Sequence, residues 1–137
     1  MPVLFKAHLF LTLYMTGLIW FVQVVHYPLM GRVGEGFFVA YERAHTRLTS
    51  WVTAPPMLLE LATGAALLYF DPVSALLQAN LAGILMLWAS TFFIQVPLHG
   101  SLSRAFSPAA HRKLVLSNWL RTALWTGRGV LLLGWGG

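Results

Sequence analysis

Residues 111–137 read HRKLVLSNWLRTALWTGRGVLLLGWGG, and this stretch decides the fold. It is apolar enough to cross a lipid bilayer, yet one helical face carries five polar or aromatic side chains at spacings of seven, three, four and three: His111, Asn118, Arg121, Trp125 and Arg128. An arginine near the bilayer centre costs at least about 2.5 kcal/mol, so two on one face need partners from other helices. The stretch therefore predicts one wall of a bundle with a polar interior.

Composition indicates an integral membrane protein of all-α class. Of the 137 residues 58% are hydrophobic and only 9% are charged, and the mean hydropathy is +0.69. A crossing helix needs about 20 residues, so the length predicts a single transmembrane domain, residues 1–137, with four crossings. We expect a multi-pass protein of the bacterial inner membrane that has the bilayer as its partner. The net charge of +5 is explained by membrane orientation and not by binding to nucleic acid.

The breaks between apolar runs predict helices at about residues 4–27, 48–70, 74–96 and 111–135. Pro28 and Pro97 are expected to end the first and third, because proline cannot continue the hydrogen-bond ladder. Residues 30–47 are rich in charge and glycine, so we expect them outside the lipid, with one interfacial helical turn at 37–41. Pro55 and Pro56 should kink the second helix and free the carbonyls of Trp51 and Val52.

Basic residues near the helix ends predict the orientation. The first and third connections carry Arg32, Arg43, Arg47, Arg104, Arg112 and Lys113, whereas the other side has Lys6 and the turn at Asp71. By the positive-inside rule these two connections lie in the cytoplasm. Both termini are then periplasmic.

Polar side chains repeat every three or four residues on each predicted helix, which indicates an internal polar site. Glu60 lies about 20 Å into the second helix, at a depth comparable to that of Arg121. We therefore predict a buried Glu60–Arg121 pair, either functional or only fixing the register of the helices. Arg128, farther along, is expected to meet Asp71 or Tyr69.

Four histidines fall at the cytoplasmic ends of the predicted helices: His26, His45, His99 and His111. Glu42 precedes His45 by three residues, as in the Glu-x-x-His pairs of di-iron bundles, although the chain lacks a second copy. With no cysteine in the chain, metal chemistry rests on imidazoles and carboxylates. The cluster predicts a site for iron, copper or zinc, or for haem b; histidines at this level also suit a merely interfacial role. His8, at the opposite end, is expected to be structural or interfacial.

The run WFVQVVHYP at residues 20–28, preceded by Lys6-Ala7-His8, resembles the first helix of the small haem-binding membrane protoporphyrinogen oxidases. Leu29 stands where that family has an arginine after the proline, and no haem ligand is carried over. The whole chain, with its His-Tyr-Pro-Leu, Gln-x-Pro-Leu-His and Asn-Trp-x-Arg-Thr elements, resembles a small four-helix bacterial inner-membrane family of unassigned activity. That resemblance implies a fold and no reaction.

These observations favour a metal- or haem-binding redox protein, and so a membrane oxidoreductase, that acts on a hydrophobic small molecule entering between the helices. The four histidines and Glu42 are the candidate ligands, and the candidate catalytic residues are Glu60, Gln95, Asn118 and Arg121. Two alternatives stay open. One is a proton- or ion-coupled transporter or channel that works as a homodimer, and the other is a scaffold subunit of a larger membrane complex.

Overall fold

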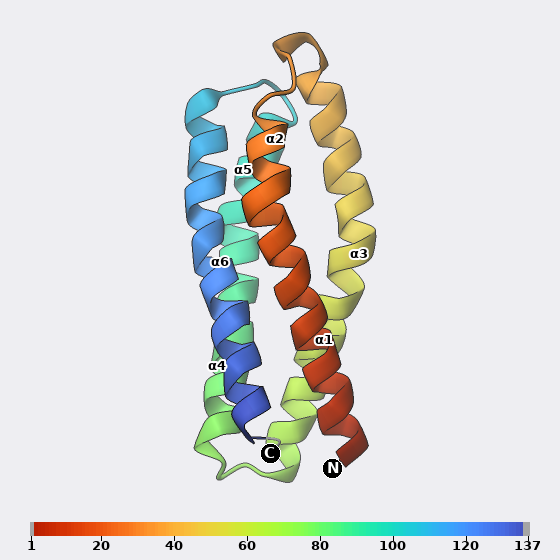
Figure 1. Cartoon of the computed structure of the whole chain (residues 1–137), viewed down its shortest axis with the longest axis vertical. Helices are drawn as coiled ribbons and strands as arrows, with labels where there is room; N and C mark the ends of the chain where they lie inside the picture. Colours follow the sequence, from red (N-terminus) through yellow and green to blue (C-terminus); the bar gives the residue numbers. More distant parts are fainter. Residues whose placement is uncertain (1, 136–137) are drawn as a thin grey trace.

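The chain folds into four antiparallel helical rods, as a computed structural model describing residues 2–135 shows (Figure 1). The first rod consists of α1 (Pro2–Phe21), the π-helical turn η1 (Val22–His26) and α2 (Tyr27–Met30), and the second is α3 (Glu35–Phe70). The third consists of α4 (Ala75–Ser90), the π-helical turn η2 (Thr91–Gln95) and α5 (Val96–Leu102), and the fourth is α6 (Pro108–Trp135). The all-α four-helix prediction is confirmed. Residues 1, 136 and 137 of the predicted domain lie outside the described part.

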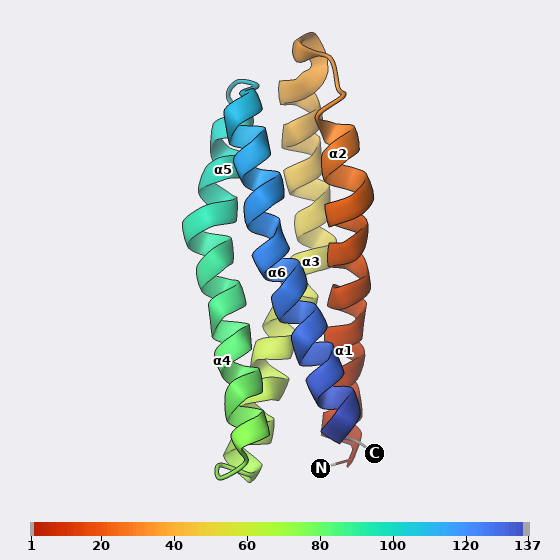
Figure 2. The same ribbon diagram turned by 60° about the vertical axis from the view of Figure 1, so that its left-hand side comes forward.

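The start of α1 and the end of α6 lie at one end of the bundle, and the α2–α3 and α5–α6 connections lie at the other (Figures 1 and 2). Three rods are long and apolar enough to cross a membrane: Val3–Met30, Glu35–Phe70 and Ala75–Leu102. α6 is not among them, although its apolar runs predicted a crossing helix. The mean hydropathy of α6 is lowered by Asn118, Arg121 and Arg128, and all three are buried in the bundle.

The outer surface of the bundle is rich in large apolar side chains, and several polar side chains lie inside it together with an apolar core. Trp51 and Phe93 are 75% and 81% exposed, whereas His8, Asn118 and Arg128 are at most 4% exposed. Large apolar groups that face outward and polar groups that face inward are the arrangement expected where lipid surrounds the helices.

Helices one and three continue past the prolines that were expected to end them. The amide of Tyr27 donates to the Val22 carbonyl and that of Val96 to the Thr91 carbonyl, each spanning five residues. The π turn starts a new helical segment in which Pro28 or Pro97 occupies one of the first two positions. Each proline thus follows closely on a π turn, where the ladder already departs from the α-helical pattern, and the rod continues although the proline has no N–H to donate.

The second rod begins at Glu35, well before the predicted residue 48, so residues 35–47 are helical and not a loop with a single turn. Tertiary packing explains the difference, because Phe38 and Glu42 on this segment are fully buried. Pro55 and Pro56 lie inside α3, and the carbonyl of Val52 accepts a hydrogen bond from the Tyr14 hydroxyl at 3.3 Å. A neighbouring helix thus satisfies the oxygen that Pro56 leaves free.

Candidate functional site

Glu42, His45 and His99 come together near the connection end of the bundle. Each offers one ligand atom, and these atoms all lie within 4.8 Å of one another. Nδ1 of His99 lies 2.5 Å from Oε1 of Glu42, and the Glu42 side chain is completely buried. Glu42 and His45 lie one turn apart on α3, while η2 carries the chain past Pro97 and so places His99 opposite them. The continuation of the helix beyond the proline is what completes the group.

His26 extends the group. Its ring stacks on His45 with centroids 4.3 Å apart, and its Nε2 is buried without a hydrogen-bond partner in the described structure. The same is true of Oε2 of Glu42. Buried polar atoms without partners are unusual in native proteins, and such atoms are often found at ion-binding sites. Two of them at one group fit the donor set of a cation site.

His111 lies apart from these three histidines, although it was predicted to be a fourth ligand. Its Nε2 is 2.8 Å from the backbone carbonyl of Tyr27, and its ring lies against Gly31, where a Cβ would be only 2.6 Å from Cε1. These contacts give His111 a role in joining α6 to α2. Tyr27 itself reaches the group, because its hydroxyl lies 3.2 Å from Nε2 of His99.

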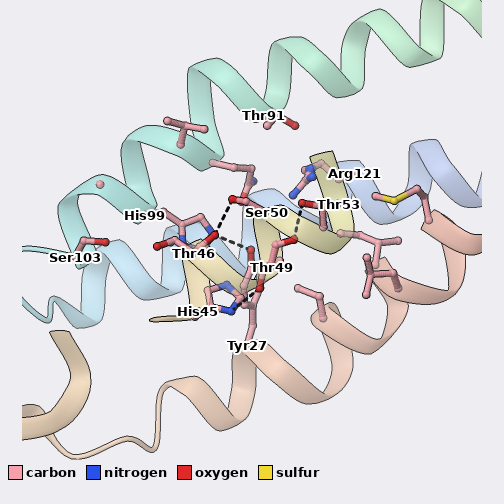
Figure 3. A pocket seen from close by; sticks show the side chains of 17 residues that line it. Tyr27, His45, Thr46, Thr49, Ser50, Thr53, Thr91, His99, Ser103 and Arg121 are labelled. Carbon is pink, nitrogen blue, oxygen red and sulfur yellow. Dashed lines mark hydrogen bonds between the residues drawn. The ribbon is translucent and has the colours of Figure 1, made fainter. Parts of the chain in front are cut away.

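A cavity of about 400 Å³ adjoins the group (Figure 3). His45, His99 and Tyr27 line it, and so does Arg121 from α6. Met15, Leu18, Ile19 and Val22 form an apolar wall, and hydroxyl side chains of α3 line the cavity as well. Ser50 of α3 and Val96 and Gly100 of α5 line it too but are exposed, so the cavity opens sideways between these two helices.

The predicted catalytic residues divide between this cavity and other parts of the interior. Gln95 and Arg121 line the cavity. Asn118 is not among its lining residues; it donates from Nδ2 to Gln23 at 2.9 Å and accepts from Arg121 at 3.3 Å. Glu60 belongs to a separate polar network nearer the chain termini.

That network corrects both predicted arginine pairings. Glu60 pairs with Arg128 at 3.0 Å and not with Arg121, while Arg128 also donates to Asn80 and not to Asp71 or Tyr69. Arg121 lies seven residues, about two turns, before Arg128, so estimating depth from each helix end chose the wrong one. His8 is fully buried here, 3.0 Å from Asn80 and 2.7 Å from Thr63, so it is structural and not interfacial.

Two residues of these sites were missed by the sequence patterns. Asn80 lies at helical spacing from Ile84, Leu87, Thr91 and Gln95, so extending the polar face of the third helix by three turns finds it. Tyr27 carries no such signal, because it precedes a proline at an expected helix end.

No protein family, curated protein or solved structure matches the chain.

Proposed function

We propose that this protein is a membrane-embedded, iron-dependent oxidoreductase acting on a hydrophobic small molecule in the cavity. The observation that carries the proposal is the group of two histidines and one carboxylate beside that cavity. A two-His-one-carboxylate set with open positions is the ligand set of non-haem iron(II) oxygenases. Iron(II) held this way supplies oxidative chemistry with dioxygen as co-substrate, and the protein supplies the dry, shaped cavity.

Glu42, His45 and His99 would hold the ion after a small rearrangement. Nδ1 of His99 and Oε1 of Glu42 are 2.5 Å apart, which is a hydrogen-bond distance, so the two side chains would separate slightly to hold an ion between them. The free Oε2 of Glu42 and Nε2 of His26 are then available as a further ligand or hydrogen-bond partner.

The histidine geometry favours an ion over haem b. Two imidazoles that ligate one haem lie on opposite faces of the porphyrin, but the rings of His26 and His45 stack 4.3 Å apart. Two rings at this distance are in direct contact, so no porphyrin fits between them.

We further propose that all four rods cross the bacterial inner membrane, in keeping with the resemblance to small four-helix proteins of that membrane. The exposed apolar surface supports this arrangement, and α6 can cross because its arginines face the bundle interior. The basic residues of the two connections then place the iron group toward the cytoplasm. A reporter fused after Gly137 should give a periplasmic signal, and a cytoplasmic signal would reverse this orientation.

Metal analysis of the purified protein tests the function. We expect about one iron per chain and a high-spin ferrous–nitrosyl signal in electron paramagnetic resonance after nitric oxide is added under reducing conditions. His45→Ala and His99→Ala should lose both, because each removes one of three ligands. His111→Gln is the matched control, since this histidine lies outside the group and should leave iron unchanged. Iron-free wild-type protein after anaerobic loading would refute the proposal.

A further inference from the structure

We infer that the cavity binds an apolar carboxylic acid, with its carboxylate on Arg121 and its far end directed toward Glu42, His45 and His99. The inference rests on the proposed function, because it names the substrate class of that same site. It is carried by an arginine that is buried, faces the cavity and has no counter-ion from the described residues.

Arg121 is only 8% exposed, and the two ion pairs of the described chain, His99–Glu42 and Arg128–Glu60, do not include it. Its one hydrogen bond to a side chain, from Nη1 to Asn118, is long at 3.3 Å. Its Nε is buried without a partner. A buried charge without compensation is strongly unfavourable, so a resident anion is the simplest way to satisfy it.

Comparison with Arg128 shows that the interior can satisfy an arginine where only structure requires it. Nε of Arg128 donates to Asn80, Nη1 to Glu60 and Nη2 to Thr12, at 3.0–3.3 Å. Arg121 has the same type of side chain on the same helix but lacks these partners. The difference coincides with surroundings, because Arg121 lines the cavity beside His45 and His99, whereas Arg128 borders a separate, otherwise apolar cavity of about 390 Å³.

The geometry of the guanidinium selects the kind of anion. Trp125 covers one face of it, with Cζ 5.1 Å from the ring centroid, and this contact holds its plane in place. A guanidinium presents parallel N–H groups, which match the two oxygens of a carboxylate. A lone ketone or alcohol oxygen would use only one of these groups.

The dimensions and lining of the cavity also limit the apolar part of the ligand. Figure 3 shows Arg121 and Thr53 at one end and His45 with Tyr27 at the other. Thr53 and His45 are eight residues apart on α3, which corresponds to about 12 Å of helix rise. The apolar side chains of Met15, Leu18 and Ile19 lie along the cavity. The fitting ligand is therefore a rigid or short-chain apolar acid, on the scale of a two-ring aromatic.

Calorimetric titration of the full chain in lipid nanodiscs tests this inference, with empty nanodiscs as the blank. The probes are 2-naphthoate and 2-naphthamide, which have nearly the same shape and differ in charge. We expect 2-naphthoate to bind at least about tenfold more tightly, as a charge-assisted bidentate contact predicts. Arg121→Gln should abolish that preference and Arg121→Lys should keep part of it. Arg47→Gln, which removes an exposed arginine of α3, should leave it unchanged.

The wild-type comparison alone decides the inference if Arg121→Gln fails to fold. Equal binding of the two probes overturns it, and so does a carboxylate preference that persists in folded Arg121→Gln. The metal result is independent of these outcomes. An iron-containing protein without carboxylate preference refutes this inference only, whereas an iron-free protein that prefers 2-naphthoate refutes the proposed redox function and retains the acid site.

Discussion

Glu60 of α3 and Arg128 of α6 are joined by a hydrogen bond of 3.0 Å between Oε1 and Nη1, across 68 residues of sequence. Trp125 donates to the other carboxylate oxygen at 3.0 Å, and Thr12 donates to Oε1 at 2.9 Å. Every oxygen of this carboxylate is thus engaged by the bundle itself. Together with Thr12 of α1 and Asn80 of α4, the pair links all four rods, and it leaves Glu60 no free oxygen for a ligand.

Breaking this pair from one side should destabilise the fold strongly. Glu60→Ala leaves Arg128 buried without its counter-ion, and we expect the free energy of unfolding to fall by about 3–5 kcal/mol. Steric trapping in bicelles measures this quantity. The double variant Glu60→Leu/Arg128→Met should lose less than Glu60→Ala, because no buried charge remains. Additive losses would mean that the two side chains do not interact.

Arg121 should behave in the opposite way. Because no described acidic residue pairs with it, Arg121→Met removes a desolvated charge and should leave the free energy of unfolding within about 1 kcal/mol of wild type, or raise it. Arg128→Met should cost about 3–5 kcal/mol. The same steric-trapping assay compares the two variants. Equal losses would show that Arg121 has a structural partner.

Gly83 of α4 packs closely against the side chain of Arg128. A Cβ at this position would lie 2.8 Å from Cδ of Arg128, whose guanidinium is already held by Asn80 and Glu60. Gly83→Ala should therefore reduce the free energy of unfolding by about 1–3 kcal/mol. Gly127→Ala is the control, because a Cβ there meets nothing within 4 Å and improves helix propensity. Thermal unfolding in detergent should rank the control above wild type and Gly83→Ala below it.

Tyr27 contacts His99 of the proposed iron site. Its hydroxyl lies 3.2 Å from Nε2, and the side chain is 2% exposed, so Tyr27→Phe removes the hydrogen bond while keeping the packing. Loss of such an outer partner typically costs 10–100-fold in metal affinity. Competition with a chelator of known affinity measures the change. Tyr69→Phe, at an exposed position on α3, should match wild type.

If Glu42, His45 and His99 hold iron as proposed, acid should release it reversibly. Protons compete with the ion for Glu42, His45 and His99, because only their deprotonated atoms bind metal. Bound iron after equilibrium dialysis should therefore decrease as pH is lowered and recover when pH is raised again in the presence of iron(II). Iron that stays bound at acidic pH in folded protein would point to a ligand set other than this one.

The sequence predicted the four rods because the apolar runs are long and turn residues separate them. The predicted helix boundaries were wrong where tertiary packing overrode the preference of the local sequence. Pro28 and Pro97 usually end a helix, but a π turn ahead of each lets the rod continue. Residues 35–47 are polar enough for a loop, yet burial of Phe38 and Glu42 holds them as helix. Neither effect is encoded in the residues next to the boundary.

The sequence predicted which polar residues face the interior better than it predicted which of them contact one another. Helical spacing correctly turned the polar faces of all four rods inward, and it placed Glu42 beside His45. It could not resolve Arg121 from Arg128 as the partner of Glu60, because the two lie seven residues apart on one face and only the axial offset of α3 against α6 distinguishes them. The prediction that His111 is a ligand was wrong for a similar reason. Its height along the bundle was predicted correctly, but its side chain contacts α2.

The cavity opens sideways, between Ser50 and Gly100. The position of this opening decides whether occupancy depends on the concentration of ligand in the lipid or in the water. Exposed apolar side chains such as Trp51 and Val96 stand beside it, so in the proposed membrane arrangement a molecule would enter from the acyl-chain region and not from water. Saturation with the proposed acid would then follow its mole fraction in the bilayer. Diluting the membrane with inert lipid at constant total acid should lower occupancy, while diluting the aqueous phase around a strongly partitioning acid should not.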